Sequence, residues 1–348
     1  MSIFDRIKIP RALEHAFPAA AFLGGFLWDS ITLGKMVQGS DLWMMFGYWV
    51  ISFGVLLMLA LRVWPPKWES RITWLVQFCF GSIFSAMVVC YFKSSGSIYT
   101  LLFVLILVAV LVANEFLQNK YTKITLSWSL LCLSGSMYLN FQLPYLVHSV
   151  GTVWFLLSCA LAFLPAWAVW KLSKRDRSSL IPPAFVTIGL VLCWFLDLIP
   201  PVPMVLKQTI ICKGFERISG EYTCLEPEQS FMKTHFGLGD FEIYHAPGEV
   251  IYALSSVFGP NDLEAHLEHR WKWLDPSGEW MERGRVPFTM RGGRISGWRL
   301  YSNKQSLEPG FWRLETALRD GAVIGSVEFK VPESPEPAGT VYQRVPLK

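Results

Sequence analysis

Charged side chains are scarce in this chain of 348 residues: they make up 17% of it, against roughly 25% in a typical soluble domain. The mean hydropathy is positive, at +0.36, which excludes an intrinsically disordered chain and argues against a wholly soluble one. Three sequence motifs are also absent: the phosphate-binding P-loop, the dinucleotide glycine fingerprint and the G-x-S-x-G nucleophile turn. The sequence therefore favours a non-enzymatic protein without a cofactor.

Cysteine is sparse outside the apolar stretches. Five of the seven cysteines lie in apolar runs and are interpreted as packing residues: Cys79, Cys90, Cys132, Cys159 and Cys193. The other two, Cys212 and Cys224, predict a disulfide, which persists in an oxidising compartment such as the periplasm. Closing this loop would stabilise the fold by about 3 kcal/mol in the chain-entropy model. Two free thiols are the alternative, and a redox pair is disfavoured because there is no C-x-x-C motif.

Long uncharged segments fill most of residues 1–201. Six of them are long enough for a helix to cross ~30 Å of hydrocarbon. They are Leu42–Leu61, Ile72–Phe92, Ser94–Asn114, Ile124–Val147, Ser149–Trp170 and Ser178–Leu196. A shorter candidate, Ala16–Trp28, ends at Asp29 and has a basic start that also fits a secretory signal peptide. Its small residues lie inside the apolar stretch rather than after it, so we interpret it as a first span, roughly from His15 to Leu33.

The distribution of lysine and arginine predicts the topology. With the N-terminus in the cytoplasm, seven spans leave twelve basic residues in cytoplasmic segments: Arg6, Lys8, Arg11, Arg62, Lys67, Arg71, Lys120, Lys123, Lys171, Lys174, Arg175 and Arg177. Two, Lys35 and Lys93, fall in outer loops. This bias follows the positive-inside rule, and omitting the first span would move the N-terminal cluster outside. We therefore expect a multi-pass protein of the bacterial inner membrane whose residues after about Val202 lie in the periplasm.

Two carboxylates fall within or beside the predicted spans. Asp29 and Asp197 are expected in the outer half of the bilayer, where an unpaired carboxylate is costly. One interpretation is a proton or cation relay, or a polar pocket that opens outward. The other is that each carboxylate lies near the interface and is hydrated or capped. The absence of any intramembrane lysine or arginine favours the second interpretation.

The composition changes after Val202 to short alternating segments separated by turn residues, which is typical of an all-β unit. The predicted strands are Val205–Phe215, Glu249–Phe258, Leu267–Trp273, Arg285–Met290, Arg294–Tyr301, Phe311–Leu318 and Ala322–Val331. A β-sandwich is the expected fold, and the immunoglobulin-like type is the form considered. The fold class is thus a membrane α-helical bundle of about seven transmembrane helices followed by an all-β sandwich. The predicted domains are a transmembrane domain over 1–203, a periplasmic sandwich over 204–331 and a flexible tail over 332–348.

The strand Leu267–Trp273 has two contrasting faces. Its odd-numbered residues, including His269 and Trp271, are predicted to face the core, and its even-numbered residues, including Glu268, are predicted to be solvated. Aromatic and guanidinium groups on one sheet can form a shallow site for a glycan, peptide or anion. The candidate binding residues are His269, Trp271, Arg299, Tyr301, Ser302, Lys304, Trp312 and Arg313. The alternative, which we favour, is that His269, Arg299 and Ser302 form an internal polar network that holds the sandwich together.

The spacing of His266 and His269 raises the question of a metal site. On a strand their odd separation points them to opposite faces, so they cannot share an ion. On a helix they would share a face, but a third ligand is not evident, and we expect no metal. Residues 202–348 carry 17 Lys/Arg against 19 Asp/Glu, which leaves no electrostatic footprint for nucleic acid.

The C-terminal part contains an ordered series of short motifs. They are Val250-Ile-Tyr-Ala, Ser255-Ser-Val257, His269-Arg-Trp271, Gly293-Arg294, Gly297-Trp-Arg-Leu-Tyr-Ser302, Gly310-Phe-Trp-Arg313 and Phe329-Lys-Val331. In this order, over about Val250–Val331, they resemble the bacterial domain of unknown function family 2914. The membrane half is similar in layout to the multi-span region that often precedes this domain. The resemblance implies an envelope-facing β domain on an inner-membrane protein and brings no catalytic residues.

Two functions are consistent with these patterns. The favoured one is an inner-membrane protein that presents a periplasmic β-sandwich as a binding or sensing module to an envelope protein or glycan. The alternative is a membrane enzyme or transporter for a lipid-linked or small polar substrate, with the β domain as a lid. The alternative requires Asp29 and Asp197 to converge on a cavity. In both cases the lipid bilayer is an expected partner, and the sequence does not fix the oligomeric state.

Overall fold

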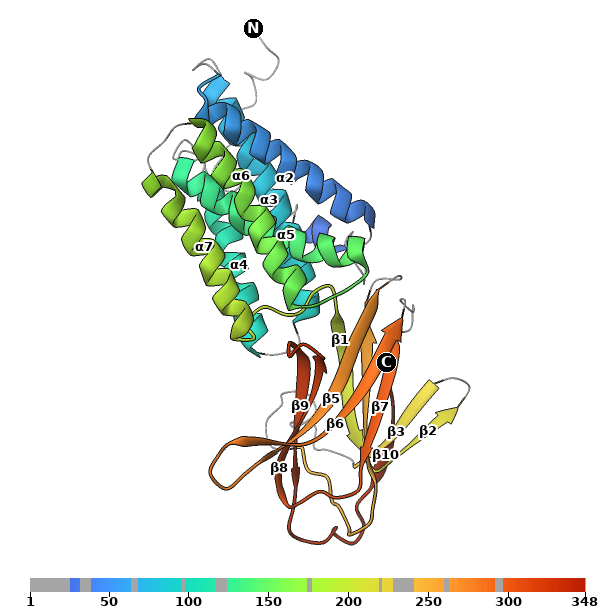
Figure 1. Cartoon of the computed structure of the whole chain (residues 1–348). Coiled ribbons are helices and arrows are strands. Elements are labelled where there is room, and N and C mark those ends of the chain that lie inside the picture. The colour runs from blue at the N-terminus through green and yellow to red at the C-terminus, as the bar shows by residue number, and fades with distance from the viewer. Residues whose placement is uncertain are drawn as a thin grey trace, which may run out of the picture.

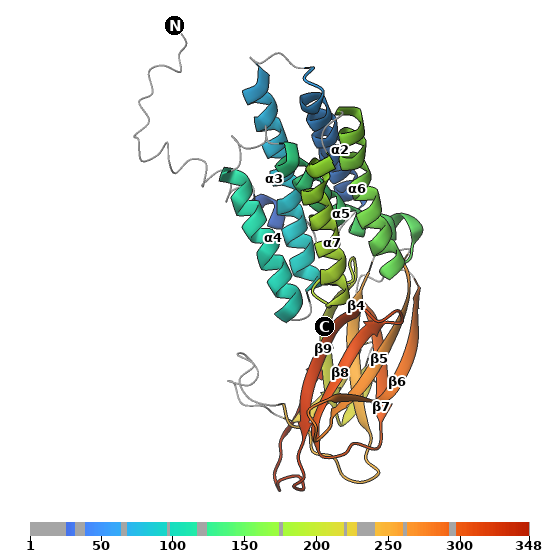
Figure 2. The ribbon, with the colours of Figure 1, turned by 60° about the vertical axis from the view of Figure 1, so that its left-hand side comes forward.

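The computed structural model describes residues 26–31, 39–63, 68–95, 98–116, 124–173, 177–218, 221–227, 241–259, 263–291 and 297–347. It consists of an N-terminal bundle of helices and a C-terminal unit of strands (Figure 1). The β unit lies at one end of the bundle, and the long helices run roughly alongside one another (Figure 2). At this level, helices followed by an all-β unit, the predicted fold class is confirmed.

The described part of the bundle contains six long helices. They are α2 (Gly39–Ala60), α3 (Glu69–Ser94), α4 (Ile98–Phe116), α5 (Ile124–Val147), α6 (Thr152–Ser173) and α7 (Ile181–Phe195). Each of the six long uncharged segments coincides with one of these helices, because only a helix pairs every backbone amide within such a segment. The first predicted span, roughly His15–Leu33, lies outside the described residues except for 26–31, which are helical.

Three of the described helices are long and apolar enough to cross a membrane, judged by length and composition. They are Gly39–Ala60, Arg71–Ser94 and Thr152–Leu172. Two shorter apolar helices cover Tyr99–Asn114 and Ile181–Phe195. An apolar helical bundle is therefore observed, and the number of seven spans stays a prediction.

Helix α5 lies in the middle of the bundle, because it packs against α2, α3, α6 and α7. The buried Asn140 side chain of α5 donates a hydrogen bond of 3.0 Å to the Tyr91 hydroxyl of α3. Trp49 of α2 donates to the backbone carbonyl of Leu131 at 3.2 Å. A Cβ atom at Gly135 would lie 2.6 Å from Trp49 Nε1, so the glycine permits the close approach of α2 and α5.

The described strands form three antiparallel sheets. The strands are β1 (Val205–Cys212), β2 (Gly214–Ile218), β3 (Glu221–Pro227), β4 (Ile251–Phe258), β5 (Glu264–Leu274), β6 (Trp280–Arg291), β7 (Trp298–Lys304), β8 (Gly310–Leu318), β9 (Val323–Val331) and β10 (Tyr342–Pro346). Their orders are β1-β4-β7, β6-β5-β8-β9 and β10-β3-β2. Ile211 and Ile251 of the first sheet pack with Trp271, Leu314 and Phe329 of the second. The two larger sheets therefore form a β-sandwich with a shared core.

The predicted strand Val205–Phe215 is in fact two strands, β1 and β2. The chain leaves the first sheet at Lys213, whose backbone amide donates to the Leu225 carbonyl at 3.1 Å. From Gly214 onward it pairs with β3, a strand that is not among the predicted ones. The continuous run of strand-forming residues hides this change of partner, because propensity does not specify which strand is the neighbour.

The end of the chain is part of the β unit, which corrects the prediction of a flexible tail over 332–348. Tyr342–Pro346 forms β10 and pairs with β3. Leu347 is 3% exposed, and its amide donates to the Tyr222 carbonyl at 2.9 Å. Proline and glutamate dominate only the connection before β10, whereas Val345 of β10 and Leu347 after it pack in a cluster with Cys212, Cys224 and Leu254.

Residues of the β unit are hydrogen-bonded to the end of the bundle. Asp320, in the β8–β9 turn, accepts from the Thr152 amide at 2.6 Å and from its hydroxyl at 3.0 Å. This contact caps the N-terminus of α6. Trp194 of α7 donates to the same Thr152 hydroxyl at 3.2 Å, and the Glu264 amide of β5 donates to the His148 carbonyl at 2.9 Å. The bonds of Asp320 and Glu264 attach the sandwich to α6 and to the turn after α5, and Trp194 joins α7 to the same Thr152 hydroxyl.

Candidate functional site

A polar network crosses the core of the sandwich between its two sheets. His269 Nδ1 of β5 lies 2.8 Å from Ser302 Oγ of β7, and His269 Nε2 lies 3.0 Å from Ser255 Oγ of β4. Trp271 Nε1 also donates to Ser302 Oγ, at 3.1 Å. Burial lowers the pKa of His269 to about 3, so its ring stays neutral.

The network makes His269, Trp271 and Ser302 internal residues rather than ligand-binding ones. All three are at most 3% exposed. Ser255 Oγ continues the network to Thr316 of the facing sheet at 3.0 Å. Arg299 does not belong to it, because odd-numbered residues of β7 point away from Ser302. The predicted network of His269, Arg299 and Ser302 is therefore observed without Arg299.

Two other candidate residues, Arg299 and Tyr301, lie on the outer side of the first sheet. The Arg299 guanidinium lies 5.5 Å from the centre of the Tyr222 ring, and the Tyr301 ring lies 5.2 Å from that of Phe215. Arg313 lies elsewhere, on β8, where it pairs with Glu328 at 2.6 Å. The eight candidate residues therefore do not form one site.

The even-numbered face of β5 is not uniformly solvated, which corrects the prediction for Glu268. Its side chain is 2% exposed, because the guanidinium groups of Arg270 and Arg285 cover it. Glu315 on β8 is similarly buried and pairs with Lys272 at 2.8 Å. The Arg270–Glu268 pair lies within β5, and the Arg285–Glu268 and Lys272–Glu315 pairs join neighbouring strands. Together they remove both carboxylates from solvent on the outside of the sheet.

His266 and His269 point to opposite faces of β5, as their odd separation predicts: the first is exposed and the second is buried. Across the part of the chain that the structure describes, no group of three or more His, Cys, Asp or Glu residues could hold a metal ion.

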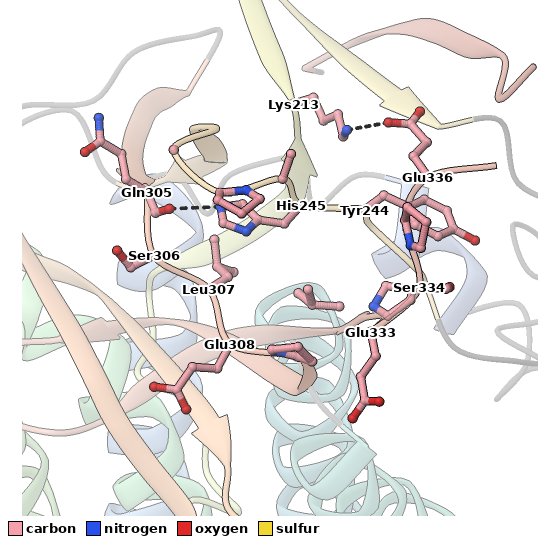
Figure 3. Close-up of a pocket in the computed structure, with 17 residues that line it drawn as sticks. Lys213, Tyr244, His245, Gln305, Ser306, Leu307, Glu308, Glu333, Ser334 and Glu336 are labelled. Atoms are coloured by element: carbon pink, nitrogen blue, oxygen red, sulfur yellow. Dashed lines mark hydrogen bonds and ion pairs between the residues drawn. The ribbon is translucent and has the colours of Figure 1, made fainter. Parts of the chain in front are cut away.

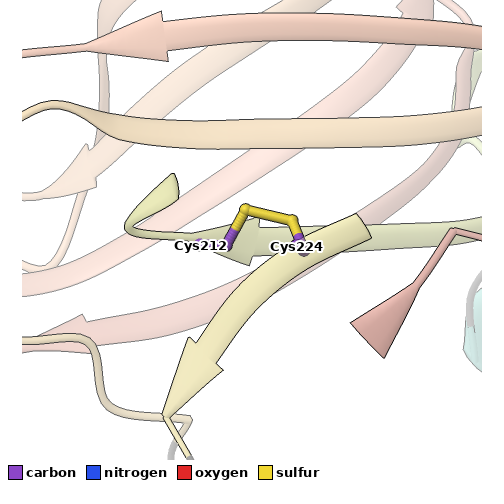
Figure 4. The surroundings of a disulfide bond; sticks show 2 residues. All are labelled: Cys212 and Cys224. Carbon is purple, nitrogen blue, oxygen red and sulfur yellow. A yellow bond between two sulfur atoms is a disulfide. The ribbon is translucent and has the colours of Figure 1, made fainter. Parts of the chain in front are cut away.

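The predicted disulfide between Cys212 and Cys224 is present (Figure 4). It joins the end of β1 to β3, with 5.8 Å between the two Cα atoms. Both cysteines are fully buried beside Leu254 and Leu347. The disulfide thus fixes the third sheet to the outside of the first.

The two predicted intramembrane carboxylates have different surroundings. Asp29 Oδ2 accepts a hydrogen bond of 2.5 Å from Ser85 of α3. Asp197 follows α7 with a φ angle of 54°, and its amide donates to the Trp194 carbonyl. Its neighbours in the sandwich include Glu315, Lys272, Arg270 and the backbone of Val323. Asp29 thus contacts the bundle, whereas Asp197 faces the β unit.

A pocket of about 660 Å³ opens at the end of the sandwich away from the helices; we call it the distal pocket. It is lined by three segments, 244–248, 305–309 and 331–336, together with Lys213. In Figure 3, His245 and Gln305 lie on one side of it and Glu333 and Glu336 on the other. Its volume is in the range of small-ligand sites.

Two tryptophans hold the 305–309 wall of the distal pocket. Trp312 Nε1 donates to the Glu308 carbonyl at 2.8 Å, and Trp273 Nε1 donates to the Pro309 carbonyl at 3.2 Å. Lys304 lies 5.5 Å from the centre of the Trp312 ring and donates to the Arg283 carbonyl at 2.8 Å. Of the eight predicted binding residues, Trp312 therefore bonds to the pocket wall, and Lys304 lies beside the Trp312 ring.

Lys213 and His245 make the polar contacts that connect the 244–248 and 331–336 walls to their neighbours. Lys213 Nζ pairs with Glu249 at 3.1 Å and with Glu336 at 2.7 Å. Burial alone would lower the pKa of Lys213, but its hydrogen bonds to Glu336 and Glu249 raise it above the ordinary value. His245 Nε2 lies 2.9 Å from the Gln305 carbonyl and 3.1 Å from the Glu249 carbonyl. Lys213 thus joins its strand to the 331–336 wall, and His245 joins the 244–248 wall to the 305–309 wall, without a ligand.

Sequence reasoning does not find the distal pocket, because its residues come from four distant stretches of the chain. His245 stands in a glycine-bearing stretch, but a lone histidine there does not indicate a site. The clustering of proline and glutamate after Val331 is the one local signal, and it also fits a mobile tail.

Comparison with protein families confirms the resemblance. Residues 264–331 match the family described as "Protein of unknown function (DUF2914)". This match includes strands β5 to β9 and the 305–309 wall of the distal pocket. No curated protein matches the chain.

Two solved structures are similar to parts of the chain. One is an immunoglobulin-like protein from Pseudomonas aeruginosa, with 12% identity, a TM-score of 0.19, and coverage of 36% of this chain and 96% of that one. The other is the alkylpurine DNA glycosylase AlkC of Pseudomonas fluorescens bound to DNA containing an abasic site analogue. It shows 11% identity, a TM-score of 0.25, and coverage of 80% and 81%. TM-scores this low do not establish a shared fold, so the immunoglobulin-like type stays a prediction.

Proposed function

We propose that this chain is a multi-pass protein of the bacterial inner membrane that presents its β-sandwich in the periplasm, where the distal pocket binds an envelope component. The observation that carries the proposal is the distal pocket itself, a cavity of about 660 Å³ at the end of the sandwich farthest from an apolar bundle. Its walls are held in place by Trp273, Trp312, His245 and Lys213.

Exposed apolar side chains support the membrane placement. Along α7, Phe185, Ile188, Leu192 and Phe195 are between 58% and 77% exposed and recur at helical spacing. A row of this kind is unfavourable in water and favourable against lipid. With the first span included, the bundle would cross the bilayer seven times.

The positions of basic residues support the orientation. Arg71 lies 5.1 Å from the Trp68 ring at the start of α3, and Lys171 lies 4.9 Å from the Trp167 ring at the end of α6. Both pairs belong to the end of the bundle opposite the β unit (Figure 1). Tryptophan and basic residues favour the membrane interface, and basic residues favour its cytoplasmic side. The sandwich would then lie in the periplasm.

The distal pocket suits binding rather than catalysis. Its lining combines apolar side chains such as Leu307 with a few polar groups, which is typical of preformed ligand sites. A sandwich that projects from the membrane would bring this pocket toward soluble or cell-wall components of the envelope.

Site-directed photocrosslinking in intact cells tests the proposal. A photoreactive residue at Ser306, in the pocket wall, should capture one envelope component that mass spectrometry can identify. The same residue at Thr289, which is exposed on β6 at the end of the sandwich near the bundle, serves as the control and should not capture it. Capture from neither position, or equally from both, would contradict binding at the distal pocket.

A further inference from the structure

We propose that the distal pocket binds a ligand carrying a primary ammonium group on an aliphatic stem, such as a lysine side chain in a peptide or a free diamine. This inference rests on the proposed function and names the ligand class for the same pocket. It is carried by the imbalance between hydrogen-bond donors and acceptors in the lining.

The one lysine in the lining is already engaged. Lys213 is 15% exposed and pairs with both Glu249 and Glu336 at 3.1 Å or less. An anionic ligand would have to compete with two carboxylates for this ammonium group. Among the described residues that line the pocket there is no other lysine or arginine, so a phosphate or carboxylate ligand is disfavoured.

Acceptors, by contrast, remain available in the lining. Glu333 is exposed and makes no ion pair with any residue that the structure describes. Glu308 lies 3.7 Å from Arg283, and both side chains are largely exposed, so this pair is weak. The two carboxylates can therefore accept hydrogen bonds from a bound cation.

His245 offers a further acceptor in its singly protonated form. Its Nε2 atom lies beside two backbone carbonyl oxygens, which only accept hydrogen bonds, so the ring proton must be on Nε2. In the singly protonated ring Nδ1 carries a lone pair, and this atom makes no hydrogen bond with the described residues. An ammonium group has three donors and no acceptor, which matches this lining.

The apolar part of the lining suits an aliphatic stem. Leu307 is 7% exposed, and Pro309 and Pro332 provide rigid apolar surface in two different walls. Tyr244 adds an aromatic ring in the third wall, and such a ring attracts a cation placed over its face. Glu308 directly precedes Pro309 and Glu333 directly follows Pro332, so a methylene chain packed on the prolines would end near these carboxylates.

Calorimetric titration of the full-length protein in lipid nanodiscs tests this inference. The probes are the blocked tripeptide acetyl-Ala-Lys-Ala-amide, the same peptide with an acetylated lysine Nε, and 1,5-diaminopentane. Binding of the lysine peptide or the diamine, but not of the acetylated peptide, is expected. The tighter of the two amines identifies the source of the ammonium group.

Matched variants locate the binding. Glu333→Gln should weaken amine binding about tenfold, because it removes one charged hydrogen bond. Glu328→Gln, a few residues earlier on β9 and outside the lining, should leave it unchanged. Equal binding of the acetylated peptide, no binding of any probe, or no effect of Glu333→Gln would overturn the ligand class. Capture from Ser306 in cells without amine binding would leave the proposed function standing, so the two failures are distinguishable.

Discussion

The Nδ1 atom of His269 lies 2.8 Å from the Oγ atom of Ser302, so a hydrogen bond joins the two facing sheets inside the core of the sandwich. The histidine is fully buried, and its other nitrogen bonds to Ser255. Both nitrogens thus have hydroxyl partners, as a buried neutral imidazole requires. The residue types that suggest a binding site in the sequence serve here to hold the sheets together.

The first prediction concerns the pH dependence of stability. Burial lowers the pKa of His269 to about 3. Below pH 6.5 this histidine is therefore protonated in the unfolded chain and stays neutral in the folded chain. The free energy of unfolding should therefore fall by about 1.4 kcal/mol between pH 7.5 and pH 5.5 on account of this residue. Chemical unfolding of the intact protein, followed by tryptophan fluorescence, measures it.

Two variants separate His269 from the other histidines. His269→Gln should remove this part of the pH dependence. His266→Gln, on the exposed face of the same strand, should keep it. An unchanged slope in His269→Gln would show that the buried imidazole is not the titrating group.

The second prediction concerns Ser302. Ser302→Ala would leave both His269 Nδ1 and Trp271 Nε1 without their hydroxyl partner. A buried polar group without a partner costs ~1–3 kcal/mol, so we expect a loss of about 2 kcal/mol in the free energy of unfolding. Asn303→Ala, at the neighbouring exposed position, should change it by less than about 0.5 kcal/mol. Equal effects of the two substitutions would refute a structural role for the network.

The third prediction concerns the disulfide between Cys212 and Cys224. Cys212→Ser should lower the free energy of unfolding by about 3 kcal/mol, because the unfolded chain loses a closed loop. Cys193→Ser, at a free cysteine of α7, should leave the disulfide intact. Thiol labelling of the unfolded protein with and without reductant shows whether the two cysteines are bonded. Labelling of Cys212 without reductant would contradict the pairing.

Part of this structure follows from local patterns in the sequence. The uncharged segments locate the helices, and alternation along β5 correctly places His269 and Trp271 in the core. The same alternation wrongly assigns Glu268 to solvent. It fails there because alternation does not account for ion pairs: Arg270, two residues along the same face of β5, and Arg285, on the neighbouring strand β6, cover the carboxylate.

The distal pocket shows why a site of this kind escapes sequence reasoning. Lys213, His245, Glu308 and Glu333 come together only after four strands have paired and the loops between them have met. No motif joins these residues along the chain. Trp312 is recognised as a candidate from its residue type, but its role, holding the Glu308 carbonyl, depends on the path of a loop.

The most direct test of the account is the side of the membrane on which the sandwich lies. Alkaline phosphatase, which is active only in an oxidising compartment, can be fused after Lys348 and compared with a fusion after Lys174, between α6 and α7. If the sandwich lies in the periplasm, the first fusion has high activity and the second has low activity. An inactive fusion at Lys348, together with an active one at Lys174, would place the sandwich in the cytoplasm and refute its proposed periplasmic position.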